Sequence, residues 1–522
     1  MSSEEPLAPR EPESEVTTDQ VPAPTVQGES VARQAAQGVI WMTGQKWVAR
    51  AGGLITITIL THLLAPEDFG LIAIAWTIVT LTYVLSDMGL ATYIIQADSV
   101  DRETLGTAFW VSMIVGITLG GLIYLAAPLL ATALNIPVAI PILQSMAGLI
   151  LIIAVTSVPL ALLRRRMAFR VLALQEVIGA LIAQVVAILA AFGGLGVWAL
   201  VLQLIVAQVV TSGFVWVAAK WLPTRDFSRS QFSTMIRFGV QVVGNGLVSV
   251  FRGWGETAII VGGLGLRELG FFTIAQRLVQ TASDLSGSAV FPISTVAFSK
   301  ANSSLDRLRA AHAKATAVAQ AVVTPLMVFI AVAAPVLVPF LFGQEWGLSA
   351  QVAQPLAVAA ALSFGTNLDH GLHNGVGRPG RWLGFTIAIF GVSVVLMLIA
   401  VPHGAVTVAI AFVGTAALET VGRWFVVGRL LGQGPLRTGW PFLLVIPSGA
   451  ASALAGLGTV WLLRDTPELV RLALTGLVVI AVHALAIRLA TPRTWTDIMS
   501  VVPRPGAWGS ARPPAGHGSQ SA

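Results

Sequence analysis

The sequence predicts an all-α, polytopic membrane protein with about 14 transmembrane helices. Hydrophobic residues make up 55% of the 522-residue chain and charged residues only 11%, whereas a soluble domain carries about 25% charged residues. The apolar runs are continuous over about 20 residues or more, which is the length that an α-helix needs to cross a bilayer. They do not alternate over about 10 residues, as the strands of a membrane β-barrel do.

Each predicted helix is an apolar run bounded by short loops that carry charged residues, Gly and Pro. The runs lie near residues 36–64, 69–95, 107–131, 141–163, 172–192, 196–219, 236–262, 268–298, 315–341, 350–376, 382–401, 405–428, 440–463 and 469–490. The loops are too short for a soluble catalytic domain, and the chain has no GxxxxGK[ST] loop and no Cys. We therefore expect neither an enzyme nor a cofactor or metal site.

The predicted domains follow from composition and from the grouping of the spans. Both ends of the chain are rich in Pro and small or polar residues, which is typical of disorder. The predicted domains are residues 1–33, a disordered cytoplasmic tail; 34–225, an N-terminal six-helix bundle; 226–430, a C-terminal six-helix bundle; 431–492, two additional helices; and 493–522, a second disordered cytoplasmic tail.

An internal repeat supports the division into two bundles. When the sequence is shifted by 200 positions, seven residues between 64 and 86 match their counterparts, against roughly 2 expected by chance in so apolar a chain. The matches are Leu64/Leu264, Gly70/Gly270, Ile74/Ile274, Ala75/Ala275, Val79/Val279, Leu85/Leu285 and Ser86/Ser286. The shift corresponds to six spans, so we expect a parallel repeat about an axis along the membrane normal.

The basic residues predict the orientation. Of the 31 Lys and Arg residues, 23 fall on one side when alternate loops and both tails are assigned to it, three fall on the other, and five lie within spans. Loops rich in Lys and Arg stay in the cytoplasm, so both termini are predicted to be cytoplasmic. Orientation thus explains the net charge of +6, and we expect no nucleic-acid partner.

Four segments carry a resemblance to a known family. They are LLAPEDFGLIAIAWTIVTLTYVLSDMGLATYIIQ (63–96), ETAIIVGGLGLRELGFFTIAQRLVQ (256–280), FPISTVAFSKANSSLDRLRAAHAKA (291–315) and PVLVPFLFGQEW (335–346). In this order and spacing, the region from about residue 34 to 429 resembles the polysaccharide-repeat-unit flippases, or lipopolysaccharide biosynthesis proteins, of the MOP exporter superfamily. The resemblance implies two bundles around a central cavity that opens alternately to the two sides. It also implies a polyprenyl-pyrophosphate-linked oligosaccharide as substrate.

Charged residues inside the spans are the candidate site. A charge at the centre of a bilayer costs from about 2.5 to more than 10 kcal/mol if it faces lipid, so it normally faces a partner or water. Arg252 and Glu256 lie four residues apart on one helical face, where they either form a structural ion pair or contact substrate. Lys46 and Arg50 have the same spacing but like charges, so they need acids from other helices, water or an anion. A pyrophosphate suits a guanidinium fork.

Three further charged residues complete the predicted site. Arg277 lies near mid-depth, where it either lines the cavity or pairs with Glu256 or Asp284. Asp87 and Asp284 are placed towards the cytoplasmic ends of their spans, where capping, a loop salt bridge or a gating role are all open. The predicted substrate-binding residues are therefore Lys46, Arg50, Arg252 and Arg277, and the coupling or gating residues are Glu256, Asp87 and Asp284. In the seventh span the related proteins commonly have Asp where this chain has Glu256.

Two other polar groups are interpreted as structural. Glu419 and Arg423 are four residues apart with opposite charges, which predicts an ion pair within one helix. Asp369, His370 and His373 have a spacing that could bind a metal ion, but three such residues near a Gly-rich helix end favour hydrogen bonding at an interface.

The predicted function is a flippase that moves lipid-linked oligosaccharide from the inner to the outer leaflet of a bacterial cytoplasmic membrane, for cell-surface polysaccharide biosynthesis. One alternative is a cation-coupled multidrug exporter of the same superfamily, for which a predominantly acidic cavity would be expected. Another is a non-transporting membrane scaffold for glycan assembly. Membrane lipids, a polysaccharide polymerase and chain-length proteins are the expected partners, and the sequence is compatible with a monomer.

Overall fold

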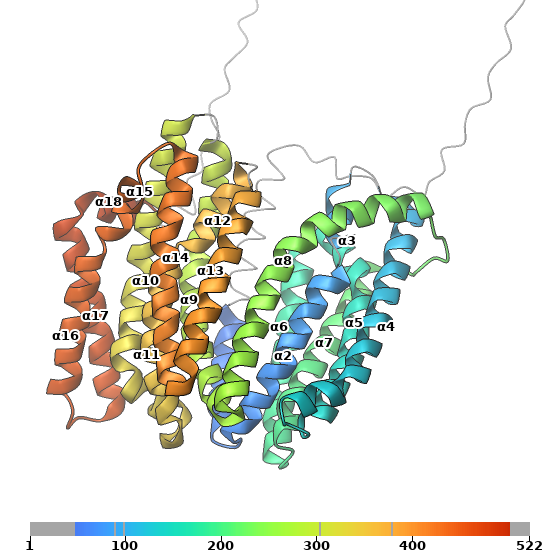
Figure 1. Cartoon of the computed structure of the whole chain (residues 1–522), viewed down its shortest axis with the longest axis horizontal. Coiled ribbons are helices and arrows are strands. Elements are labelled where there is room, and N and C mark those ends of the chain that lie inside the picture. The colour runs from blue at the N-terminus through green and yellow to red at the C-terminus, as the bar shows by residue number, and fades with distance from the viewer. Residues whose placement is uncertain (1–46, 88–89, 98–99, 302–303, 377–378, 502–522) are drawn as a thin grey trace, which may run out of the picture. The chain divides into compact units, whose positions relative to one another are not determined.

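The computed structural model describes residues 47–87, 90–97, 100–301, 304–376 and 379–501. Every element that it contains in these ranges is a helix (Figure 1). Ten of the described helical segments are long and apolar enough to cross a membrane. The all-helical, polytopic membrane fold predicted from the sequence is therefore confirmed, whereas the count of fourteen spans and their arrangement around a central cavity stay predictions.

The helices follow the predicted spans closely. The first half of the chain contains Trp47–Thr61, α2 (Pro66–Asp87), α3 (Leu90–Gln96), α4 (Arg102–Ala133), α5 (Ala139–Arg165), α6 (Phe169–Phe192), α7 (Val197–Ala219) and α8 (Arg229–Leu264). The second half contains α9 (Leu266–Ala301), α10 (Leu305–Phe342), the short η1 (Gln344–Trp346), α11 (Gly347–Ser363), α12 (Thr366–Gly375), α13 (Pro379–Ala400), η2 (Val401–His403), α14 (Ala405–Leu431), α15 (Pro435–Leu443), α16 (Ile446–Leu462), α17 (Glu468–Ala490) and α18 (Pro492–Val501).

The chain divides into two compact units. Unit 1 is built mainly from Ile78–Val186 and Leu202–Leu247, and unit 2 from Arg50–Thr77, Ala187–Val201 and the chain from Val248 onward. Because these boundaries fall inside helices such as α6 and α8, they do not test the bundle boundaries 34–225 and 226–430, which stay a prediction.

Unit 1 is centred on α4 and α5, which lie side by side (Figure 1). Phe109 of α4 and Val158 and Leu162 of α5 belong to one buried apolar cluster. The ring of Phe109 also meets Trp216 and Trp221 edge-on, with centroids 6.3 and 5.7 Å apart. Such edge-to-face contacts between large aromatic rings stabilise the cluster beyond their buried area.

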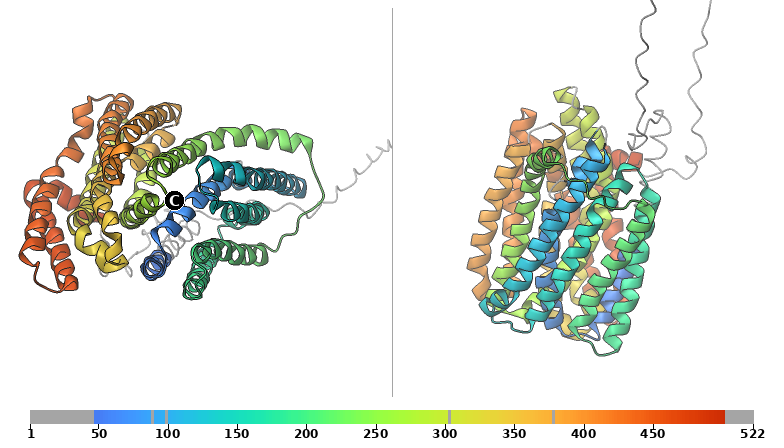
Figure 2. Two further views of the ribbon diagram at one scale, coloured as in Figure 1. Left: turned by 60° about the horizontal axis from the view of Figure 1, so that its bottom comes forward. Right: turned by 90° about the vertical axis from the view of Figure 1, so that its right-hand side faces the viewer.

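Unit 2 is organised around α10. This helix packs against α9 and α11 and also against α16 and α17. Figure 1 and Figure 2 show α16 and α17 as an adjacent pair at the edge of this unit. A Cβ atom on Gly456 would lie 2.8 Å from Val479 and 3.3 Å from Val332, so the missing side chain lets three helices approach closely. His483 Nε2 also lies 3.0 Å from the carbonyl oxygen of Ala321. Helices α16 and α17 are thus packed directly onto α10.

Arginines from the predicted cytoplasmic side bind the C-terminal ends of neighbouring helices. Arg165 donates to the carbonyls of Ile94 and Ala97 at the end of α3, at 2.8 and 2.5 Å. Arg166 donates to Ala219, the last residue of α7, at 2.8 Å. Arg309 donates to the carbonyls of Leu431 and Gly432 at the end of α14, at 2.7 and 3.0 Å. These contacts satisfy terminal carbonyls and place positive charge at the negative end of each helix dipole.

The predicted span 350–376 is interrupted between α11 and α12, at Phe364 and Gly365. The carbonyl oxygen of Leu362 accepts hydrogen bonds from Thr420 Oγ1 at 2.8 Å and from Arg423 Nη2 at 3.4 Å, both on α14. Polar side chains of the neighbouring helix thus satisfy a backbone carbonyl beside the break, as a low-dielectric environment requires. The guanidinium of Arg423 occupies the space where a side chain of residue 365 would lie, so Gly is needed there.

Substitution Gly365→Ala is expected to destabilise the protein by about 1–3 kcal/mol, because overpacking a buried site has a cost of this order. The new Cβ would lie 2.1 Å from Arg423 Nη1, and Arg423 is held by hydrogen bonds. The unfolding temperature in detergent measures the effect. Gly391→Ala in α13 is the control, since no heavy atom lies within 4 Å of its Cβ position. Equal unfolding temperatures for the two variants would contradict the steric argument.

Candidate functional site

Arg50 and Asp284 form an ion pair between the helix Trp47–Thr61 and α9. Arg50 Nη2 lies 3.0 Å from Asp284 Oδ2, and the two side chains are 25% and 37% exposed. Gln280, one turn earlier on α9, donates to Asp284 Oδ1 at 2.9 Å. Within the described residues the Nη1 atom of Arg50 is buried and has no hydrogen-bond partner. The pair with Asp284 therefore leaves this nitrogen of the guanidinium unpaired.

The sequence suggested that Asp284 lies towards the cytoplasmic end of its span, but it is the nineteenth of the 36 residues of α9 and lies near the middle of the helix. Arg50 accordingly has an acidic partner from another helix, which was one of the possibilities left open for it. Neither helix capping nor a loop salt bridge describes this contact.

Arg277 is an exposed cation near mid-depth on α9. It is eleven residues after Leu266, which is about 17 Å along the helix, whereas half of the hydrocarbon layer is about 15 Å thick. Among the residues that the structure describes, no ion pair or hydrogen bond engages its guanidinium. Arg277 lies seven residues, or about two turns, before Asp284 on the same face of α9, and Asp284 is paired with Arg50, so these three residues form a group with one more cation than anion.

Arg252 and Glu256 form a second, electrically balanced pair on α8. Arg252 Nε donates to Glu256 Oε1 at 2.9 Å, and the side chains are 35% and 15% exposed. Glu419 of α14 adds a further attraction for Arg252. The ion pair that the sequence offered as one of two interpretations is therefore present, and contact with substrate stays a prediction.

Two predicted site residues cannot be placed. Lys46 lies outside the described residues, and Asp87 is the last residue of α2, with its side chain outside the described part. Their predicted roles remain predictions.

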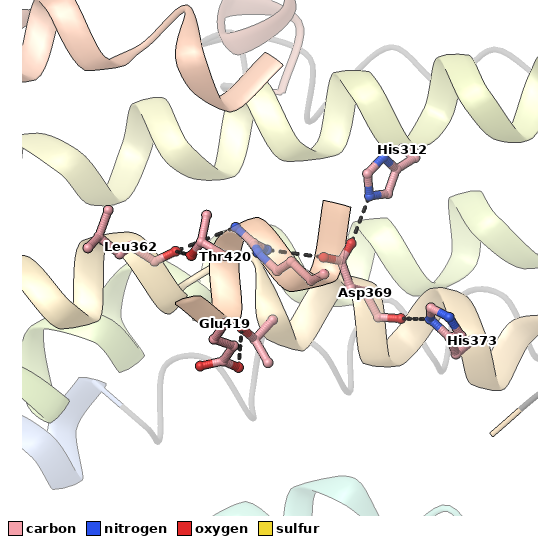
Figure 3. Close-up of polar contacts among 8 residues, drawn as sticks. His312, Leu362, Asp369, His373, Glu419 and Thr420 are labelled. Carbon is pink, nitrogen blue, oxygen red and sulfur yellow. Dashed lines mark hydrogen bonds and ion pairs between the residues drawn. The ribbon is translucent and has the colours of Figure 1, made fainter. Parts of the chain in front are cut away.

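A third polar group is buried in unit 2 between α10, α12 and α14, and Figure 3 shows it in close-up. Asp369 receives Arg423 Nη1 at 3.1 Å on one carboxylate oxygen and His312 Nε2 at 2.7 Å on the other. His373 Nδ1 donates to the backbone carbonyl of Asp369 at 2.8 Å. All four side chains are nearly inaccessible to solvent. Their arrangement joins three helices through one carboxylate.

This group corrects the predicted ion pair between Glu419 and Arg423. Arg423 is bound to Asp369 of α12, while Glu419 accepts a hydrogen bond from Thr366 Oγ1 at 2.9 Å (Figure 3). Spacing along one helix identified the charged residues but gave the wrong partner, because the break after α11 brings Asp369 within reach of Arg423. His312 was not predicted, since nothing near it in sequence marks it as polar and buried.

The group formed by Arg50, Arg277 and Asp284 is suited to binding an anion. Its surplus positive charge and its two guanidinium groups match a ligand with several negative oxygen atoms, such as a phosphate or diphosphate. The Asp369 group is different, because each carboxylate oxygen already has a partner.

A protein-family model matches the chain. The family model described as "Polysaccharide biosynthesis protein" matches residues 59–351, which is more than half of the chain. The succinoglycan biosynthesis transport protein ExoT of Rhizobium meliloti is 28% identical over 341 residues, covering 65% of this chain and 68% of that protein. The lipopolysaccharide biosynthesis protein WzxC of Escherichia coli is 23% identical over 432 residues, covering 80% of this chain and 87% of that protein.

A solved structure shares the fold. The lipid II flippase MurJ, in an inward closed conformation, matches with a TM-score of 0.71 and 14% identity, over 86% of this chain and 98% of that chain. At this identity the likeness concerns the fold alone.

Substitution Asp369→Ala is expected to destabilise the protein by about 3–5 kcal/mol, because it leaves Arg423 buried without its carboxylate. Thermal or denaturant unfolding in detergent measures this effect. Asp465→Ala provides the control, since Asp465 and Arg464 form an exposed pair 3.6 Å apart, for which no measurable change is expected. An Asp369→Ala protein that unfolds like the control would show that the buried group contributes no stability.

A double-mutant cycle on Arg50→Ala and Asp284→Ala should give a coupling energy of only about 0.5–1 kcal/mol. Both side chains are partly exposed, so solvent screens their attraction. Unfolding of the two single variants and the double variant in detergent provides the value. Strict additivity would show that the two charges do not interact.

Proposed function

Because the chain belongs to the polysaccharide biosynthesis protein family, we propose that it is a flippase that transports polyprenyl-pyrophosphate-linked oligosaccharide repeat units. It moves them from the inner to the outer leaflet of a bacterial cytoplasmic membrane, for the synthesis of a cell-surface polysaccharide. Two relatives whose names refer to succinoglycan transport and lipopolysaccharide biosynthesis support this substrate class.

The uncompensated charge of Arg277 is the observation that carries the proposal. A guanidinium cannot lose its proton at any relevant pH, and in lipid it would be costly. No ion pair or hydrogen bond from the described residues engages it, and Asp284 is already bound to Arg50 and Gln280. Water and a diphosphate are the partners that suit it. In this proposal the diphosphate of the substrate binds between Arg50 and Arg277 and replaces part of its lost hydration with charge-assisted hydrogen bonds.

The distribution of charge also separates the proposal from its alternatives. A multidrug exporter that selects cationic drugs would need surplus negative charge at its binding residues, whereas the group of Arg50, Arg277 and Asp284 has surplus positive charge. A scaffold that transports nothing would gain nothing from an unpaired guanidinium in the membrane, since it adds cost without a ligand. Transport of an anionic lipid-linked substrate uses this charge.

The orientation and partners of the protein complete the proposal. Both termini lie in the cytoplasm, as the distribution of Lys and Arg predicts. The substrate is received from enzymes that assemble repeat units on the lipid carrier, and is passed to a polymerase and chain-length proteins outside. Lys46, Arg252, Glu256 and Asp87 contribute to binding or gating.

Arg50→Ala and Arg277→Ala are each expected to lower glycan export about tenfold or more, because a charge-assisted hydrogen bond contributes about 1.5–3 kcal/mol. A strain with the gene deleted is complemented with each variant. Exported glycan, lipid-linked repeat units on the inner leaflet and protein in the membrane are measured together. The inner-leaflet units should accumulate at normal protein levels.

Arg464→Ala is the matched control, because Arg464 carries the same charge in an exposed position, where among the described residues it pairs with its neighbour Asp465. Arg277→Lys keeps the positive charge but loses the planar guanidinium group, which can donate two parallel hydrogen bonds. Intermediate export is therefore expected. Unchanged export by Arg50→Ala and Arg277→Ala at normal protein levels would refute the assigned substrate site and favour the scaffold.

A further inference from the structure

The two helices related by the internal repeat meet at their N-terminal ends within unit 2. α2 begins at Pro66 and α9 at Leu266, which is the same shift of 200 positions that relates the two halves of the sequence. Glu67 and Arg267 also occupy equivalent positions, and Arg267 Nη1 lies 3.2 Å from Glu67 Oε1. The repeat therefore places equivalent residues opposite each other.

Two glycines make the contact between the helices reciprocal. A Cβ atom on Gly70 would lie 2.3 Å from the carbonyl oxygen of Leu266, and a Cβ atom on Gly270 would lie 1.8 Å from that of Pro66. Each glycine thus packs against the first carbonyl of the other helix. Such exchange of equivalent contacts is what a two-fold axis produces. Since backbone oxygen atoms occupy both positions, no other residue fits without separating the helices.

Aromatic residues surround the contact. Trp346 of η1 is fully buried, with its ring edge-on to Phe69 of α2 and to Phe271 of α9, at centroid distances of 5.3 and 5.5 Å. Its Nε1 donates to the carbonyl of Thr61 at 3.1 Å. Trp346 therefore contacts elements of both repeats at the level where α2 and α9 meet.

We infer that this contact of Gly70, Gly270, Glu67 and Arg267 is the extracytoplasmic gate of the transporter, which separates when substrate is released outside. The inference rests on the proposed flippase function and on the predicted orientation, in which the loops before α2 and α9 face outward.

The interactions in the contact are of kinds that can be broken and re-formed. Backbone packing at glycine is held by dispersion and weak C–H···O contacts. The Glu67 and Arg267 side chains are 41% and 59% exposed, so water can replace each partner when they part. The buried Asp369 group in the same unit cannot be separated at low cost, because breaking the ion pair would leave Arg423 and Asp369 buried without a partner of opposite charge. A contact that opens in each transport cycle requires interactions that can be broken at low cost, such as the glycine packing and the exposed ion pair.

The absence of Cys from the chain allows a direct test by cross-linking. Glu67→Cys and Arg267→Cys are introduced together, and the disulfide or a short thiol cross-linker is formed in membranes. Export by the reduced protein should be close to that of the wild type. Cross-linking should lower it at least tenfold, and a reducing agent should restore it.

Lys314→Cys with Asp497→Cys is the matched control. These residues form an ion pair of 2.8 Å between α10 and α18, with comparable exposure of 49% and 34%, and no separation is expected there. Cross-linking this pair should leave export unchanged. Continued export by the protein cross-linked at 67 and 267, or failure of that cross-link to form, would overturn the inference.

Distance measurements between spin labels separate failure of the gate from failure of the proposed function. Spin labels on the cysteines at 67 and 267 report the gate without transport, and both a short and a long distance are expected. If the spin labels show only a short distance, the contact is not a gate, even if glycan is exported. If they show both distances but the wild-type protein exports no glycan, only the proposed function is contradicted. Gly270→Ala should shift the population to the long distance, while Gly262→Ala, with no atom near its Cβ position, should not.

Discussion

An arginine in the hydrocarbon layer of a bilayer keeps its positive charge. Much of this structure follows from the need to place a carboxylate, water or an anionic ligand beside that charge. Three intramembrane arginines are matched by carboxylates, in the pairs of Arg50 with Asp284, Arg252 with Glu256, and Arg423 with Asp369. Arg277 has no such match among the described residues. The same principle thus accounts for the three matched pairs and for the proposed binding site, where the charge of Arg277 is not matched.

Local spacing explains which features could be predicted from the sequence. The membrane class and the positions of the helices follow from the length of apolar runs, which is a property of consecutive residues. The contact between Arg252 and Glu256 follows from the helical repeat, because residues four apart share a face. The family likewise could be identified from short segments such as 256–280, and the family match confirms it.

Contacts between distant helices could not be predicted in this way. Arg423 was assigned to Glu419 on its own helix, because nothing in the sequence indicates that Gly365 interrupts a span and turns Asp369 towards α14. Asp284 was placed towards a helix end, but it lies near the middle of α9 and pairs with Arg50 of another helix. Partners of buried charges depend on which helices are neighbours, and spacing in one helix carries no information about that.

The arginines at the ends of α3, α7 and α14 have a consequence for the interaction of the protein with lipids. Positive residues in the loops orient the chain while it inserts, when they are free to bind anionic headgroups. In the folded protein Arg165, Arg166 and Arg309 donate to backbone carbonyls instead. Folding therefore withdraws from the bilayer surface some of the cations that guided insertion. The mature protein should hold fewer anionic phospholipids at its predicted cytoplasmic face than a count of its basic residues suggests.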